Sequence, residues 1–145
     1  MRYIIGFLVV VALSGISLWA EEEDLLFRDH YQAGGWENEL GYSQAVKVGN
    51  VIFISGTRAP GKNMETQMKT IYMRLQSVLG RYGATMNDVT QERIYTTDLA
   101  MLKSLSRERK RFYNSGIYPA VSWVQVEALA DEAALLEIEL VVVID

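Results

Sequence analysis

The residue types that carry most enzyme chemistry are scarce in this sequence. It contains no cysteine and a single histidine, His30, among 145 residues. Without cysteine the chain can form neither a disulfide nor a lipid-modified amino terminus, and thiol nucleophiles and thiolate metal sites are excluded as well. A Ser-His-Asp triad would have to use His30, and a lone histidine near a chain end is typically a surface residue. The composition therefore disfavours serine hydrolase chemistry.

Two carboxylates and two hydroxyls remain as candidates. Glu137 and Glu139 alternate near the carboxyl end, so on a strand they share one face, a spacing typical of solvent-exposed or interface residues. Neither has neighbours in the sequence that indicate a metal site, and we expect no metal and no cofactor. Tyr42 and Ser55 stand at the ends of predicted strands, where they can satisfy backbone groups or orient a ligand.

The charge balance of the chain is acidic. It has 14 Lys and Arg against 18 Asp and Glu, a net charge of -4 at pH 7. The one concentrated basic run is Arg107-Glu-Arg-Lys-Arg111, whose charges would spread around most of a helix, so we interpret it as a solvated helix face. Because domains that bind nucleic acid are usually basic, no nucleic-acid partner is expected.

The first twenty residues differ from the rest. Arg2 precedes an apolar run that ends at Ala20, and four acidic residues follow. This order predicts a secretory signal peptide cleaved after Ala20, or an uncleaved anchor in the membrane, since the run is just long enough to span a bilayer. We therefore predict an exported, periplasmic protein. Its organisation would be a signal peptide or anchor at 1–20, a lead-in segment at 21–40 and one domain at 41–145.

These candidate residues must be positioned by one small domain. Gly49-Asn50 is a two-residue hairpin turn between alternating apolar runs, and Asp98 is a helix cap. The predicted elements are a short strand near 26–31, strands at 43–48 and 51–55, a helix at 64–82, a strand at 89–97, a helix from 99 to 113, and strands at 120–127 and 135–144.

This order predicts an α+β fold, a single mixed sheet with two helices on one face. The last strand is apolar on both faces and should be central. After Pro119, alternation places Val121, Trp123 and Gln125 on one face of a strand. We expect Val121 and Trp123 on the sheet face that the helices leave uncovered, and such a face is typical of an oligomer interface.

Several short motifs of this chain coincide with those of one known family. They are Gly41-Tyr-Ser-Gln-Ala45, Val48-Gly-Asn50, Ile54-Ser-Gly56, Tyr82-Gly-Ala84 with Asp88-Val89, Tyr95-Thr-Thr-Asp98, Pro119-Ala-Val-Ser122 and Glu137-Ile-Glu139. In this order and spacing they resemble the Rid proteins, the reactive intermediate deaminases, which are also called YjgF-like or L-PSP endoribonuclease-like. The resemblance covers about residues 41 to 142.

The resemblance implies a chorismate-mutase-like fold and a homotrimer whose three sheets form a central barrel with small-molecule clefts between subunits. In the deaminases of the family, the cleft hydrolyses a 2-imino or enamine acid to a 2-keto acid and ammonia, without a metal or an organic cofactor. Carried over by position, Tyr42 and Ser55 match the cleft tyrosine and serine. Glu137 matches the carboxylate thought to hold or activate water.

Three positions depart from the family pattern. The carboxylate-binding arginine that should follow Pro-Ala is Val121, the small residue two further on is Trp123, and Ser106 stands where an asparagine is common. Valine offers neither charge nor donor, and losing one partner of a desolvated pair costs on the order of 2–5 kcal/mol. Ordinary amino-acid-derived imines should therefore be poor substrates. Arg58 could replace the lost cation, or it could be a solvated loop residue.

Three functions stay open on these residues. The first is a hydrolase for an imine, enamine or related carbonyl compound without a free carboxylate. The second is a non-catalytic trimeric binding module for an apolar or aromatic small molecule at Val121 and Trp123. The third is a structural trimer whose clefts are filled by tryptophan. The endoribonuclease label of some family members is a weaker alternative, because the chain is acidic and predicted to be exported.

Overall fold

The computed structural model describes residues 27–113 and 116–145. The predicted signal peptide at 1–20 lies outside these residues. Six strands form one sheet: β1 Arg28–Tyr31, β2 Ala45–Val48, β3 Val51–Thr57, β4 Val89–Thr96, β5 Ala120–Gln125 and β6 Leu136–Val143. The helices are α2 Trp36–Leu40, α3 Met64–Arg81, α4 Leu99–Ser104 and α5 Ser106–Lys110, with a short 3-10 helix at Met86–Asp88. Within the described residues, no helix has the length and apolar character needed to cross a membrane.

The sheet is mixed, as predicted. Its strand order is β1-β2-β3-β6-β4-β5, in which β4 and β5 are parallel and the other neighbours are antiparallel. The β2–β3 hairpin closes with Val48 opposite Val51, and Gly49 has a positive φ of 57°. A left-handed residue is what a tight two-residue hairpin turn requires, and glycine adopts that conformation without a steric penalty. The hairpin and the central position of β6 are confirmed.

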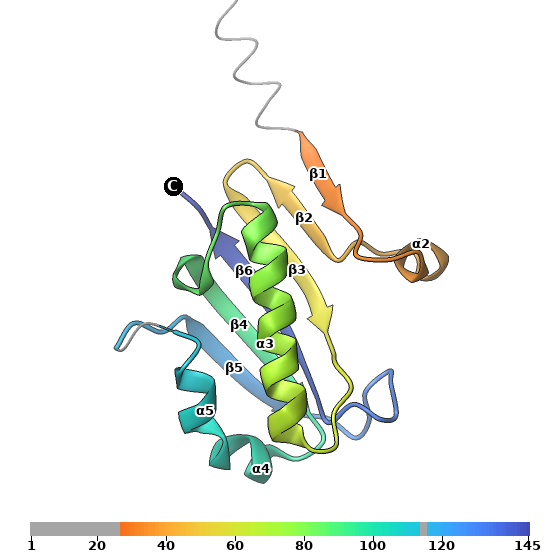
Figure 1. The fold of residues 1–145 in the computed structure, drawn as a ribbon, viewed down its shortest axis with the longest axis vertical. Coiled ribbons are helices and arrows are strands. Elements are labelled where there is room, and N and C mark those ends of the chain that lie inside the picture. The colour runs from red at the N-terminus through yellow and green to blue at the C-terminus, as the bar shows by residue number, and fades with distance from the viewer. Residues whose placement is uncertain (1–26, 114–115) are drawn as a thin grey trace, which may run out of the picture.

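Helix α3 packs on one face of this sheet, α4 and α5 lie beside β5, and α2 lies beyond the β1–β2 edge (Figure 1). Asn63 caps α3 by accepting a hydrogen bond from the Thr66 backbone N–H at 2.9 Å. Along α3, Met68, Ile71, Leu75 and Leu79 are fully buried, at the 3–4 residue spacing of one helical stripe. Burying each such side chain contributes about 1.5–3 kcal/mol, so this stripe fixes the helix on the sheet.

The opposite face of the sheet is not covered by any of the described elements. Its side chains include exposed Phe53, Val124 and Val143. Arg93 and Glu139 form an ion pair across β4 and β6 there, with Arg93 Nη1 2.6 Å from Glu139 Oε1. The prediction of one uncovered sheet face is thus confirmed.

Val121 and Trp123, however, do not lie on that face, so this prediction is wrong. In the parallel β4–β5 pairing Val121 is opposite Glu92 and Trp123 is opposite Ile94, and both partners are fully buried on the helix side. Side chains of paired residues point to the same face of a sheet. Alternation along β5 therefore predicts which residues share a face, but it does not identify that face.

Two local predictions also need correction. The single helix predicted from 99 to 113 is two short helices, because the chain turns at Leu105, whose N–H bonds the carbonyls of Met101 and Leu102. The lead-in, predicted to hold at most one short strand, contains β1 and also α2. Helix α2 ends at Gly41, which has a φ of 77° and donates its N–H to the Glu37 carbonyl at 2.8 Å.

Candidate functional site

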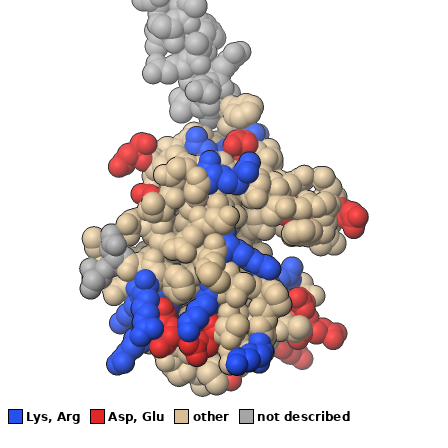
Figure 2. Space-filling model, viewed as in Figure 1, with Lys and Arg blue, Asp and Glu red and all other residues tan. Residues whose placement is uncertain are grey.

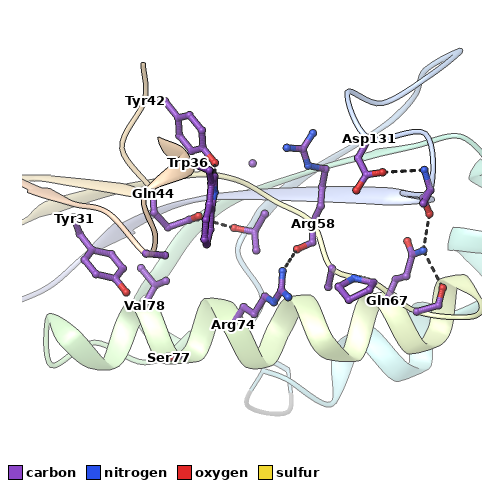
Figure 3. Close-up of a pocket in the computed structure, with 17 residues that line it drawn as sticks. Tyr31, Trp36, Tyr42, Gln44, Arg58, Gln67, Arg74, Ser77, Val78 and Asp131 are labelled. Atoms are coloured by element: carbon purple, nitrogen blue, oxygen red, sulfur yellow. Dashed lines mark hydrogen bonds between the residues drawn. The ribbon is translucent and has the colours of Figure 1, made fainter. Parts of the chain in front are cut away.

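A cleft lined by polar, charged and aromatic side chains lies between α3 and the β3 end of the sheet. It has a volume of about 600 Å³ and is open to solvent. Three segments wall it: α2 with the residues around it, the loop from β3 to α3, and the loop before β6 (Figure 3). Its polar and aromatic lining includes Trp36, Tyr42, Gln44, Arg58, Arg74 and Asp131.

Glu137 lies against Gly56, a residue of the cleft wall. The β3–β6 register shifts between Ile54 and Thr57, and Gly56 lies inside this irregularity. A Cβ at position 56 would stand 2.0 Å from Glu137 Oε1, so a larger residue here would require the carboxylate to move. Glu137 Oε2 then lies 3.4 Å from Arg58 Nε, and their side chains are 23% and 29% exposed. The pair is therefore accessible from the cleft.

The backbone of Arg58 is anchored to helix α3. Its carbonyl accepts a hydrogen bond from Arg74 Nη1 at 2.6 Å, which ties the β3–α3 loop to helix α3. The closest approach of the Arg58 guanidinium to Glu137 is through Nε, and within the described residues its two Nη groups have no hydrogen-bond acceptor. Asp131, on the same rim, accepts a hydrogen bond from the Ala133 N–H at 3.0 Å.

An aromatic pair forms another wall of the cleft. Trp36 Nε1 donates to Tyr42 Oη at 3.1 Å, and both residues line the cleft (Figure 3). Helix α2 presents Trp36 because the fully buried Glu37 accepts the backbone N–H groups of Ala33 and Gly34 at 2.8 and 2.9 Å. Trp36 is missed by the sequence analysis. The signal that could reveal α2 is the short polar run before Gly41, a helix-ending glycine.

Ser55 and His30 lie next to this cleft rather than in it. Ser55 Oγ donates to the Ser43 carbonyl at 2.7 Å, so its hydroxyl satisfies a backbone group at the start of β2. Ser55 also lines a shallow groove on the uncovered face together with Phe53, Arg93 and Glu139. His30 is exposed, and its Nδ1 lies 3.1 Å from Ser43 Oγ.

Val121, Trp123 and Ser106 are not brought to the cleft within one chain. Strands β6 and β4 separate β3 from β5, which is the far edge of the sheet. Val121 is 45% exposed, whereas Trp123 is partly buried and packs against the hydrophobic core. The Trp123 indole Nε1 is buried without a hydrogen-bond partner among the described residues. Ser106 is the first residue of α5.

A second charged cluster is enclosed between the sheet and the helices. Glu92 accepts hydrogen bonds from Arg109 Nε at 2.6 Å, from Arg109 Nη2, from Tyr72 Oη at 2.5 Å and from Tyr113 Oη at 3.0 Å. Burial first, and then the Glu92 carboxylate, raises the pKa of Tyr72 and of Tyr113 well above the ordinary value. The Arg109 guanidinium also lies 5.9 Å from the centre of the Trp123 ring.

Arg109 corrects the interpretation of the basic run as a wholly solvated face. It is only 5% exposed, whereas Arg107, Lys110 and Arg111 are exposed. On the face shown in Figure 2, basic and acidic side chains are interspersed, with several of each at the end that carries α4 and α5. In residues 27–113 and 116–145, no group of three or more His, Asp and Glu side chains could hold a metal ion.

The chain is similar to known proteins both in sequence and in fold. The model of the Endoribonuclease L-PSP family matches residues 36–144, which include α2 and all of the cleft lining except Tyr31 and Ala33. A Dermatophagoides farinae protein named 2-iminobutanoate/2-iminopropanoate deaminase is 32% identical over 114 residues, which are 72% of this chain and 86% of that protein.

Two solved structures share the fold. A Mycobacterium tuberculosis protein described as a member of the YjgF/YER057c/UK114 family superposes with a TM-score of 0.76 at 31% identity, covering 81% of this chain and all of that chain. RidA from the Antarctic bacterium Psychrobacter sp. PAMC 21119 superposes with a TM-score of 0.68 at 28% identity, covering 83% of this chain and 98% of that chain.

Proposed function

The chain belongs to the Endoribonuclease L-PSP family, the Rid or YjgF-like proteins, and from this premise we propose that it hydrolyses an imine or enamine to a carbonyl compound and ammonia. The observation that carries the proposal is the Glu137 carboxylate, which lies against Gly56 and beside Arg58, two residues that line the cleft. A relative of 32% identity is named as a deaminase of this kind, which supports the reaction class.

Glu137 acts on water in the proposed reaction. Its carboxylate accepts a proton as the water oxygen bonds to the C=N carbon, which gives a carbinolamine. The first proton passes to the nitrogen and completes the carbinolamine. The proton of its new hydroxyl then passes to the same nitrogen, the C–N bond breaks, and ammonia leaves as the C=O group forms. No electrons are gained or lost in these steps, and they require no metal or organic cofactor.

Tyr42 and Ser55 position the reactants in this proposal. Tyr42 Oη accepts the Trp36 indole N–H, so its own O–H stays available to donate to a substrate. Ser55, which directly precedes Gly56 in β3, donates to the carbonyl of Ser43. Ser43 follows Tyr42 in the chain, so this bond holds the segment that carries Tyr42. Tyr42 is thus the orienting donor, and Ser55 supports the wall that carries it.

We also propose that the cleft is completed by a second copy of the chain in a homotrimer. Tyr42, Arg58 and Glu137 lie at one part of the sheet, whereas Val121 lies on the opposite edge strand β5. Docking β5 of one copy against the β3 end of the next would bring Val121 to the cleft from the neighbour. The uncovered sheet face, with exposed Phe53 and Val143, supports association of this kind.

A binding module for an aromatic small molecule is the second candidate function. It is favoured by the Trp36–Tyr42 wall and by Val121, which cannot bind a carboxylate as arginine does. Ribonuclease activity has less support, because the acidic chain offers no extended basic surface on the face in Figure 2 and Arg109 is buried in an ion pair. Export to the periplasm remains part of the proposal and rests on residues 1–20.

Ammonia release from 2-iminobutanoate, generated in place by an amino-acid oxidase, tests the hydrolase. If Glu137 activates water, Glu137→Gln should lower the rate by about 100-fold or more, since general acid–base groups contribute about 10²–10⁴-fold. Glu65→Gln is the control, because Glu65 forms a surface pair with Lys69 on α3. A wild-type rate equal to the uncatalysed rate would reject hydrolysis of this imine. Restoration by Val121→Arg would then indicate a cleft that serves a different ligand.

A further inference from the structure

We propose that Arg58 is the anion receptor of the cleft and that the Trp36–Tyr42 wall selects a flat ring, so that the ligand is an aromatic monocarboxylate. In the reaction this ligand would be an aromatic 2-imino acid, and that part rests on the proposed function, whereas the binding part does not. The inference reverses the expectation of a substrate without a carboxylate. It assigns the anion to Arg58 and not to the position that Val121 occupies on β5.

The first support is the orientation of the Arg58 guanidinium. Its closest approach to Glu137 is through Nε, at 3.4 Å, and in the described residues the edge formed by the two Nη groups of this planar fork donates no hydrogen bond to that carboxylate. Within the described residues no protein oxygen accepts from this edge, and Figure 3 shows the guanidinium standing in the cleft. Two parallel N–H groups of this kind match a carboxylate.

The second support is the balance of charge around Arg58. Four charged groups face or border the cleft: Arg58, Arg74, Asp131 and Glu137. Asp131 is engaged by the Ala133 N–H, and Glu137 faces Nε of Arg58. Arg74 donates to the Arg58 carbonyl through one nitrogen and keeps its charge beside the same loop. A ligand carboxylate would therefore meet Arg58 with Arg74 close by, rather than a cluster of carboxylates.

The third support is the fixed aromatic wall opposite Arg58 (Figure 3). Trp36 is 53% exposed, yet its ring is held by the hydrogen bond to Tyr42 and by contact with Gly34. A Cβ at Gly34 would lie 1.8 Å from Trp36 Cζ3, so the indole lies directly against that glycine. An exposed indole with a fixed orientation offers a large flat apolar surface for a second ring.

The size of the cleft fits this ligand class. A volume of about 600 Å³ lies within the range of roughly 300–1,000 Å³ that is usual for small-molecule sites. A ligand of one ring and one carboxylate would use both walls, whereas a short aliphatic acid would reach Arg58 and leave the indole uncovered. For the imino acid, water adds to the C=N carbon and ammonia leaves as before, which yields the aromatic 2-keto acid.

Binding of three stable probes to the full-length protein tests the inference without any turnover. The probes are 3-phenylpropanoate, its neutral amide 3-phenylpropanamide, and propanoate, and isothermal titration calorimetry gives each Kd. We expect 3-phenylpropanoate to bind about 10- to 100-fold more tightly than the amide, since charge-assisted bidentate hydrogen bonds distinguish them. Arg58→Gln should remove this preference and leave the amide Kd within about 2-fold of wild type.

Matched variants separate a site effect from a folding effect. Arg111→Gln removes an exposed arginine outside the cleft and should leave every Kd unchanged. Arg58→Lys keeps the charge but loses the fork, so its preference for the acid should be intermediate. Gly34→Ala should weaken the binding of 3-phenylpropanoate and leave the Kd of propanoate unchanged, because its Cβ would displace the Trp36 ring. The adjacent Gly35→Ala should change neither Kd, because a Cβ at position 35 meets nothing within 4 Å.

The outcomes distinguish this inference from the proposed hydrolase. Equal binding of the acid and the amide by wild type, or an unchanged acid Kd in Arg58→Gln, would overturn the inference. Glu137-dependent ammonia release that is indifferent to Arg58→Gln would leave the hydrolase standing and the inference rejected. Arg58-dependent binding of 3-phenylpropanoate, with no release of ammonia from any imine, would support the anion receptor and reject the hydrolase.

Discussion

Two arginine–glutamate pairs in this molecule have the same chemistry and opposite settings. Arg109 and Glu92 are almost fully buried between the helices and the sheet, with side chains 6% and 0% exposed. Arg58 and Glu137 meet at the cleft with 29% and 23% exposed and a single approach of 3.4 Å. The first pair is enclosed by protein on every side, and the second faces solvent.

The difference between the pairs lies in how far their hydrogen bonds are satisfied. Glu92 accepts from both Arg109 nitrogens and from the hydroxyls of Tyr72 and Tyr113, so both carboxylate oxygens are used by the protein. Arg58 keeps one edge of its guanidinium without a protein acceptor in the described residues. A closed network fixes the fold, whereas an open one can exchange water for a ligand.

The largest effect is expected from breaking the buried pair. Arg109→Met would leave the Glu92 carboxylate buried without its cation, and removing one partner of a buried pair costs about 3–5 kcal/mol. Urea unfolding followed by circular dichroism, at fixed protein concentration, measures the change in free energy of unfolding. Arg107→Met, in the same helix but exposed, should change it by less than about 0.5 kcal/mol.

A double variant shows whether the cost comes from the stranded charge. Glu92→Gln combined with Arg109→Met removes the charge and keeps a carbonyl oxygen that can accept from Tyr72 or Tyr113. We expect it to recover at least half of the stability lost in Arg109→Met. If the single variant lost less than about 1 kcal/mol, Glu92 would have to be reached by water, and the distinction between the two pairs would fail.

An effect of intermediate size is expected at alkaline pH. Burial and then Glu92 raise the pKa of Tyr113 in the folded protein, so above pH 10 the unfolded chain loses this proton first. The free energy of unfolding therefore falls as pH rises above 10, by up to about 1.4 kcal/mol per pH unit for each such tyrosine. Below pH 10 the full stabilisation from these tyrosines is present. Tyr113→Phe should make the fall between pH 10 and 12 shallower than in wild type.

Tyr118→Phe is the control for this alkaline prediction. Tyr118 is exposed and donates no hydrogen bond to Glu92, although its ring contacts that of Tyr113. Its variant should keep the wild-type slope of the free energy of unfolding against pH. Equal slopes in wild type and Tyr113→Phe would show that Tyr113 is not shielded from solvent, and the buried cluster would then resemble the cleft pair.

Most of the fold could be predicted because it depends on local patterns. The Gly49-Asn50 turn fixes the hairpin, the apolar stripe fixes α3, and Asp98 caps α4 through the Met101 N–H. The sheet face on which Trp123 lies could not be predicted, because it is set by the pairing of β5 with β4. In β4, Glu92 is fully buried, whereas a glutamate in a sequence is usually expected to be exposed. The burial of Arg109 could not be predicted for the same reason, because its partner Glu92 lies 17 residues away in the chain.

Only part of the candidate site could likewise be predicted from the sequence. The family motifs identify Tyr42 and Glu137, and the structure brings both to the Gly56 and Arg58 end of β3. Trp36 carries no motif, and its role depends on Glu37 folding α2 back toward Tyr42. Val121 stays on the far edge strand β5, so within one chain it does not meet the cleft that the motifs of Tyr42 and Glu137 indicate.

The smallest effect on stability should come from the pair with the largest effect on binding. Arg58→Gln removes a partly exposed ion pair, and such pairs contribute about 0–1 kcal/mol, so the free energy of unfolding should change by no more than that in the same urea experiment. The Arg58 carbonyl still accepts from Arg74, so the loop keeps its anchor to α3. A loss of 3 kcal/mol would mean that Arg58 and Glu137 support the fold as Arg109 and Glu92 do. A small loss combined with a weakened acid probe would show that Arg58 is kept for a ligand.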